Sequence, residues 1–222
     1  MTISVAHRIV SSQQHLYVPA TEPPHGPVVT HNERWADISN YTGPLTEQGC
    51  ADLKAAGFVG IISQAITGLD GNTYTRQQLE MAQQCDLRLA GYMWCFPGAS
   101  ELGVRYRLEM FDGFVLEFLA LDLEQQGTHV IDVERDLALC DPYWRGKTWV
   151  YSGKWFFDQQ GWSHLDLWAD RPLWDSDYDG EPDVDVGFVP YGGWTQRAMK
   201  QYRGTSTIGV VDQIDLNVRR GE

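Results

Sequence analysis

Short apolar runs alternate with helical patterns along this chain from position 34 onward. A strand followed by a helix, repeated many times, gives parallel strands joined by crossover helices. We expect strands at 34–38, 58–64, 89–94, 118–124, 148–151 and 166–169, helices at 46–56, 74–85, 102–110 and 130–140, and closing elements at 198–202 and 211–216. About eight strands in roughly 190 residues predict an α/β fold, an irregular (β/α) barrel with fewer helices than a complete one.

An open, doubly wound parallel sheet is the alternative architecture for the same alternation. Such sheets usually carry a glycine-rich loop for a dinucleotide or a phosphate after the first strand. Here the first strand ends in Asp37-Ile38-Ser39-Asn40, without such a loop. The closed barrel is therefore the preferred interpretation.

The length of 222 residues allows one sizeable hydrophobic core. Residues 1–33 differ from the rest, because the stretch 21–27 gathers prolines and a glycine that break regular structure. We expect an N-terminal arm over 1–33 and one catalytic domain over 34–222.

Charge and composition exclude several classes of function. The chain has 17 basic and 30 acidic residues, a net charge of -13, which disfavours nucleic acid as a partner. No apolar run reaches the roughly 18 to 20 residues of a membrane span, so no membrane insertion is expected, and no secretory signal peptide is visible. Neither the four cysteines nor the six histidines show zinc-site spacing.

Two carboxylates lie at the end of the clearest buried strand, in Leu121-Asp122-Leu123-Glu124. Side chains two positions apart on a strand face the same way, about 6 to 7 Å apart. Two such groups cannot both ionise freely at low dielectric, so one is driven toward the neutral acid while the other stays charged. Glycoside hydrolysis uses this arrangement. Parallel barrels carry their chemistry at this end of their strands.

Two further acids are expected to join this pair. Asp37 ends the first strand and Asp215 lies on the last, and these strands are neighbours in a closed barrel. Four carboxyls at one mouth suit either a divalent metal ion or a glycosidic bond. Aromatic residues on or beside strand ends favour the sugar, because their rings can stack on pyranose faces. These residues are Tyr151, Trp168 and Tyr202.

Several short motifs, in this order, resemble the glycoside hydrolase family 25 lysozymes, the Chalaropsis-type N-acetylmuramidases of fungi, bacteria and phages. The family has an opening Asp-x-Ser strand, an Asp-x-Glu signature, a Tyr-Thr/Ser-Gly turn, a Leu-Trp-x-Ala strand and a closing Gln-Tyr, Gly and Asp-x-Asn. The matching residues are Asp37-Ile38-Ser39, Asp122-Leu123-Glu124, Tyr151-Ser152-Gly153, Leu167-Trp168-Ala169-Asp170, Gln201-Tyr202, Gly209 and Asp215-Leu216-Asn217.

The resemblance implies an irregular (β/α) barrel that cleaves the β-1,4 bond between N-acetylmuramic acid and N-acetylglucosamine in bacterial cell-wall peptidoglycan, with retention. It implies that Glu124 is the acid/base and that Asp122 orients the 2-acetamido group or stabilises the developing oxocarbenium ion. Asp37 and Asp215 would flank the site. Catalysis would require no cofactor. Substrate-binding side chains are expected at Tyr92, Tyr151, Trp168 and Tyr202.

Three segments depart from the family pattern. The stretch 63–68 replaces the usual Lys and Thr/Ser-Glu-Gly, and the third strand ends in Tyr92-Met93-Trp94-Cys95-Phe96 where the family commonly has Tyr-His-Phe. Lys200 stands where Trp usually precedes Gln-Tyr. We therefore expect the reaction to be kept and the surrounding groove to differ.

Other interpretations stay open at this point. The barrel would otherwise be a catalytically retired module that binds glycan or serves structurally in a virion, or a different glycosidase. Without a signal peptide, a phage endolysin, a virion-associated lysin or an enzyme exported by a non-classical route fits the resemblance.

The acidic segment 175–185 begins like an EF-hand calcium loop, with aspartates at positions 1, 3 and 5 and glycine at position 6. Position 12 is Val186, so a complete EF-hand is excluded. A non-standard structural calcium site remains a hypothesis beside a solvated acidic turn. Its expected ligands are Asp175, Asp177, Asp179 and Asp183.

Overall fold

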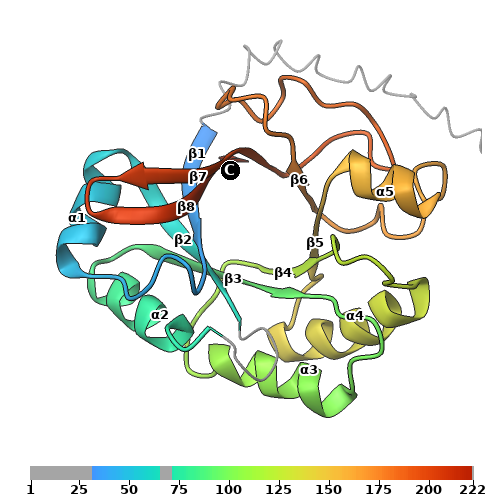
Figure 1. Cartoon of the computed structure of the whole chain (residues 1–222), viewed down its shortest axis with the longest axis horizontal. Coiled ribbons are helices and arrows are strands. Elements are labelled where there is room, and N and C mark those ends of the chain that lie inside the picture. Colours follow the sequence, from blue (N-terminus) through green and yellow to red (C-terminus); the bar gives the residue numbers. More distant parts are fainter. Residues whose placement is uncertain (1–31, 66–71, 222) are drawn as a thin grey trace, which may run out of the picture.

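The computed structural model describes residues 32–65 and 72–221, which form one closed barrel of eight strands (Figure 1). Strands β1 to β7 run parallel to one another, while β8 is antiparallel to both β7 and β1. The predicted α/β barrel is confirmed. The expected arm over 1–33 lies outside the described residues, except that Asn32 and Glu33 already belong to β1.

Helices follow each of the first five strands. The strands are β1 (Asn32–Ile38), β2 (Phe58–Gln64), β3 (Arg88–Trp94), β4 (Leu119–Asp122), β5 (Trp149–Ser152), β6 (Leu173–Ser176), β7 (Met199–Ile208) and β8 (Val211–Arg220). The helices are α1 (Glu47–Ala55), α2 (Thr75–Gln84), α3 (Glu101–Leu108), the 3-10 helix η2 (Glu109–Phe111), α4 (Val130–Trp144) and α5 (Lys154–Gln160). In the described part of the chain no helix follows β6 or β7, and no helix is long and apolar enough to cross a membrane.

Local sequence signals set the ends of α1. The Thr46 hydroxyl caps the helix by accepting a hydrogen bond from the Gly49 backbone N–H at 3.1 Å. Gly57 follows the helix with a φ of 83°, a left-handed conformation that glycine adopts without steric cost. The predicted helix over 46–56 is thus present, and strand β2 begins directly after this turn.

One predicted strand is wrong. Residues 167–169 form bends and a turn and none of 166–169 is in a strand; the sixth strand is β6, which begins at Leu173. The chain holds two Leu-Trp pairs, at 167–168 and 173–174, and the second pair enters the barrel wall. Helix α5 is not among the expected helices; it has only seven residues and is separated from β5 by a single residue.

The barrel interior is filled largely by aromatic rings. Phe118 contacts Trp35 and Trp174 edge-on, with ring centroids 5.7 and 6.4 Å apart, and stacks on Trp149 at 4.2 Å. Gly60 leaves room for the Trp35 ring, since a Cβ there would collide with it. These rings close the barrel below the end at which the parallel strands finish, so that end can hold a pocket with a solid floor.

Candidate active site

Four acidic side chains gather where the parallel strands end. Asp37 lies near the end of β1, Asp122 ends β4, Glu124 follows two positions later, and Asp215 reaches the same end from antiparallel β8. They line a pocket of about 190 Å³. Its other lining residues are Ser39, Tyr41, Gln64, Tyr92, Trp94, Tyr151, Trp174, Tyr178 and Gln201.

Two of the four carboxyls are held rigidly. Asp37 and Asp215 are direct partners across β1 and β8. The Gln201 Nε2 donates to Asp37 Oδ2 at 2.8 Å and to Asp215 Oδ2 at 3.1 Å. Asn217 Nδ2 adds a bond to Asp37 Oδ2 at 2.9 Å, and the Thr205 backbone N–H donates to Asp215 Oδ1 at 2.6 Å. These acids therefore form a fixed wall of the pocket.

The other two carboxyls are unpartnered. No described residue donates a hydrogen bond to the side chain of Asp122 or Glu124, and the buried Oδ1 of Asp122 has no partner. Asp122 is 2% exposed, whereas Glu124 is half-buried. A buried carboxyl oxygen without a partner is costly, so it marks a place where a ligand group can bind. The lone pairs and protons of these two acids remain available to a substrate.

Burial raises the pKa of all four carboxyls. It raises the pKa of Asp37 to about 8, reinforced by the charge of Asp215, although Asn217 and Gln201 oppose the shift. Burial, then the charge of Glu124, raises the pKa of Asp122 well above its usual range. Burial followed by Asp215 raises the pKa of Glu124, and burial raises that of Asp215. The cluster therefore retains protons near neutral pH and can act as an acid.

Two of the expected aromatic side chains line the pocket. Tyr92 and Tyr151 are buried in its wall, and the Tyr151 hydroxyl donates to Gln201 Oε1 at 2.6 Å. Sequence reasoning missed four more aromatics, Tyr41, Trp94, Trp174 and Tyr178. Trp94 was detectable, because it lies two positions after Tyr92 on the same strand and faces the same side.

The other two expected aromatics lie elsewhere. Trp168 is buried against Phe157 and Trp162, and its Nε1 donates to Glu134 at 2.7 Å. It lies in a loop after α5 because the strand expected there does not form. Tyr202 is on β7, but it points out of the barrel into the layer beneath the helices, since its neighbour Gln201 points in. Contrary to the expectation, neither Trp168 nor Tyr202 lines the candidate pocket.

Protein cations occupy the place expected for calcium. Arg197 Nη1 donates to Asp175 at 2.7 Å and to Asp177 at 2.8 Å, and Lys200 Nζ donates to Asp179 at 2.7 Å. In the described ranges no three His, Cys, Asp or Glu side chains gather so as to hold a metal ion. The carboxylates pair with two cations from β7 and the residues before it, so they do not converge on a calcium site. This corrects the expected ligand set Asp175, Asp177, Asp179 and Asp183.

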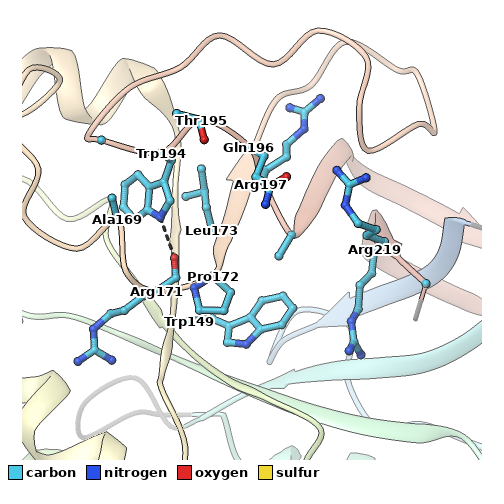
Figure 2. Close-up of a pocket in the computed structure, with 14 residues that line it drawn as sticks. Trp149, Ala169, Arg171, Pro172, Leu173, Trp194, Thr195, Gln196, Arg197 and Arg219 are labelled. Carbon is cyan, nitrogen blue, oxygen red and sulfur yellow. Dashed lines mark hydrogen bonds between the residues drawn. The ribbon is translucent and has the colours of Figure 1, made fainter. Parts of the chain in front are cut away.

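A larger pocket, of about 470 Å³, lies at the opposite end of the barrel (Figure 2). Trp149 and Leu173 line it from the first residues of β5 and β6, and Arg219 lines it from the end of β8. Its arginines already pair with acids, as Arg171 does with Asp141 at 2.7 Å. Among the described residues no acidic side chain lines this pocket, so the smaller carboxyl-lined pocket is the candidate active site.

A closed (β/α) barrel with four carboxyls at the carboxyl ends of its strands has the architecture of a barrel glycoside hydrolase. Solved structures identify the fold more closely. The family 25 glycosyl hydrolase from Bacillus anthracis superposes with a TM-score of 0.66 at 14% identity, over 89% of this chain and 93% of that one. The muramidase from Acremonium alcalophilum gives 0.65 at 21% identity, over 86% and 94%. The chain has the family 25 lysozyme fold.

Sequence comparisons are more limited. No family model matches the chain. Counting factor 50 of Dictyostelium discoideum is 41% identical over 71 residues, which is 30% of this chain and 22% of that protein's length. The CTP1L endolysin has a similar structure, with a TM-score of 0.66 and 21% identity over 86% of this chain and 67% of that one. The likeness to this chain is thus mainly one of fold.

Proposed function

We propose that this protein is a peptidoglycan hydrolase, an N-acetylmuramidase that cleaves the β-1,4 bond after N-acetylmuramic acid with retention. The observation that carries the proposal is the division of the four carboxyls into two kinds. Asp37 and Asp215 are fixed by hydrogen bonds, while Asp122 and Glu124 face the pocket with none. A retaining glycosidase needs two available carboxyls on one sugar.

Glu124 is the proposed acid/base. Its raised pKa, caused by burial and by Asp215, favours the protonated form that donates to the glycosidic oxygen. The C1–O bond breaks, its electron pair stays on the leaving oxygen, and positive charge develops at C1. The Glu124 carboxylate then removes a proton from the incoming water, which restores the acid.

Asp122 has the proposed role of orienting the 2-acetamido group or stabilising the charge at C1. Its buried Oδ1 has no partner within the described residues, so an acetamido N–H can donate to it. Attack of the acetamido oxygen on C1 from the opposite face, followed by attack of water, gives two inversions and hence retention. No step uses a metal ion or a cofactor.

We propose bacterial cell-wall peptidoglycan as the partner and a phage endolysin as the setting. Structures named as endolysins, CTP1L and ply40, have the same fold, at 21% and 15% identity. A virion-associated lysin or an enzyme exported by a non-classical route would use the same chemistry. The net charge of -13 disfavours nucleic acid as a partner.

Clearing of a purified cell-wall suspension tests the proposal. The wild-type protein should lower the turbidity, and Glu124→Gln and Asp122→Asn should not, although both should keep the wild-type circular dichroism spectrum. Glu47→Gln on the exposed side of α1 is a matched control for loss of a carboxylate, and it should clear at the wild-type rate. Wall binding without clearing by the wild-type protein would support the retired glycan-binding barrel instead.

A further inference from the structure

The loop after β6 brings a tyrosine to the acid cluster. Tyr178 lines the pocket, and its hydroxyl donates to Gln201 Oε1 at 2.7 Å and lies 3.3 Å from the Tyr151 hydroxyl. Gln201 therefore accepts from two tyrosines through its oxygen and donates to Asp37 and Asp215 through its nitrogen. All four hydrogen bonds of this amide are used, so its orientation is fixed.

Two buried cations hold the loop that carries Tyr178. The Arg197 side chain is 1% exposed and binds Asp177, the Val184 carbonyl oxygen at 2.7 Å and the Val186 carbonyl oxygen. The Lys200 side chain is fully buried and donates to Asp179 at 2.7 Å and to the Val186 carbonyl oxygen at 3.1 Å. These bonds hold the acidic loop, residues 177–186, at both its beginning and its end.

One strand, β7, carries both a cation that holds the loop and the glutamine that binds the acid cluster. Lys200 and Gln201 are consecutive on β7, so their side chains point to opposite sides of the barrel wall. On the outer face of the barrel wall Lys200 donates a hydrogen bond to the loop. On the inner face Gln201 donates hydrogen bonds to Asp37 and Asp215. The backbone N–H of Asp177 also donates to the Gln201 carbonyl oxygen at 3.0 Å, which places Tyr178 directly beside its partner.

We propose that Lys200 and Arg197 are positioning residues for the reaction: by clamping the acidic loop they place the Tyr178 hydroxyl on Gln201, which in turn orients Asp37 and Asp215. This inference rests on the proposed function for its kinetic consequences. The geometry that it assigns to Tyr178 and Gln201 does not depend on which glycan is cut.

Charge explains why the loop needs cations. The segment 175–185 carries six acidic residues within eleven positions, and their repulsion opposes a fixed conformation. Burial alone would raise the pKa of Asp179, but the hydrogen bond and charge of Lys200 outweigh it and the pKa lies below its usual range. Because the ammonium is fully buried, salt screens this attraction poorly.

A double-mutant cycle tests the proposal. The variants are Lys200→Met, Tyr178→Phe and the two combined, with Lys200→Met/Asp179→Asn as a variant that leaves no unpaired charge. Lys147→Met is the matched control, since Lys147 forms an exposed 2.7 Å pair with Asp170 away from the pocket. Hydrolysis of a soluble peptidoglycan fragment gives kcat and KM for each protein.

We expect Lys200→Met and Tyr178→Phe each to lower kcat about tenfold, the effect of one lost positioning hydrogen bond. KM should stay within about twofold and Lys147→Met should match the wild type. The combined variant should be no slower than either single variant, because both changes break the same chain of contacts. Additive losses, or an unchanged kcat in folded Lys200→Met/Asp179→Asn, would overturn the proposal.

A second readout is independent of turnover. Gln201 lowers the pKa of Asp37, against the raising effects of burial, Asp215 and Glu124. Loosening Gln201 should therefore move the Asp37 carboxyl titration, followed by carbon-13 NMR, to higher pH in Lys200→Met and in Tyr178→Phe. An inactive wild-type protein with this shift would reject the proposed function and keep the positioning role. An unchanged titration in both variants would reject the positioning role.

Discussion

Asp37 and Asp215 lie directly opposite each other on antiparallel strands β1 and β8, and both accept a hydrogen bond from Nε2 of Gln201. Closure of the barrel between its first and last strands creates this pair. Two carboxyls that share one amide group cannot both be charged without strong repulsion. Hydrogen bonds from Gln201 hold these two carboxyls in place, while Asp122 and Glu124 remain available for the substrate.

Replacing Gln201 with methionine should destabilise the protein and nearly abolish activity. Methionine has a similar size but makes none of the four hydrogen bonds, so two carboxyls and two hydroxyls each lose one buried partner. We expect a loss on the order of 3 kcal/mol in the free energy of unfolding. Urea unfolding measures it. Gln64→Met is the control, because Gln64 lines the same pocket and its side chain bonds to no described residue.

Asp37→Asn should remove a pH dependence of stability. The folded state keeps the Asp37 proton up to about pH 8, whereas the unfolded chain releases it near 3.8. Stability of the wild-type protein therefore falls as pH rises through this window. At pH 8 the variant should be more stable by about 1 kcal/mol or more, which is about 2 to 4 °C in Tm for a domain of this size.

Melting curves between pH 4 and pH 8 check the Asp37→Asn prediction. Glu80→Gln on the exposed face of α2 is the control and should melt in parallel with the wild type. If the gap between Asp37→Asn and the wild-type protein does not widen as pH rises, Asp37 is not the protonated group.

Trp94 and Trp168 should respond differently to mutation. Trp94 lines the pocket, so Trp94→Ala should raise KM about tenfold by removing a stacking surface. Trp168 is buried away from the pocket, so Trp168→Phe should leave kcat and KM unchanged and lower stability by about 1 to 2 kcal/mol through its lost bond to Glu134. Kinetics and melting curves of both variants separate the substrate-stacking role of Trp94 from the structural role of Trp168. A raised KM in Trp168→Phe would contradict the structural role.

Calcium should have no effect on stability. Arg197 and Lys200 already neutralise the carboxylates that calcium would bind. Melting curves with calcium and with EDTA should coincide, whereas Arg197→Met should lower stability by about 3 to 5 kcal/mol, because Asp175 is left buried without its cation. A calcium-dependent rise in Tm would restore the metal-binding interpretation.

The sequence pattern predicted the barrel well because its signals are local. Apolar runs and breakers located six of the eight strands, the closing element at 198–202 falls on β7, and α1 lies within the predicted range 46–56. Barrel closure then placed Asp37 and Asp215 at the mouth that holds Asp122 and Glu124. Strand periodicity alone predicted that Asp122, the last residue of β4, and Glu124, two positions beyond it, form a pair.

The errors concern features that only tertiary contacts decide. Two Leu-Trp pairs six positions apart have equal local propensity, and strand pairing with β5 and β7 selects Leu173-Trp174. The acidic loop has the pattern of a calcium site, but its partners, Arg197 and Lys200, lie up to two dozen positions away in sequence. Gln201 appeared only as part of a motif, because its four bonds join residues from five separate segments.

Analysis of the new reducing ends in digested peptidoglycan tests the central claim most directly. The digest is reduced with borohydride and examined by mass spectrometry, for the wild-type protein and for Glu124→Gln. We predict that the wild type creates reduced N-acetylmuramic acid ends and that Glu124→Gln creates them about 10² to 10⁴ times more slowly. Reduced N-acetylglucosamine ends, or equal rates for the two folded proteins, would contradict the account.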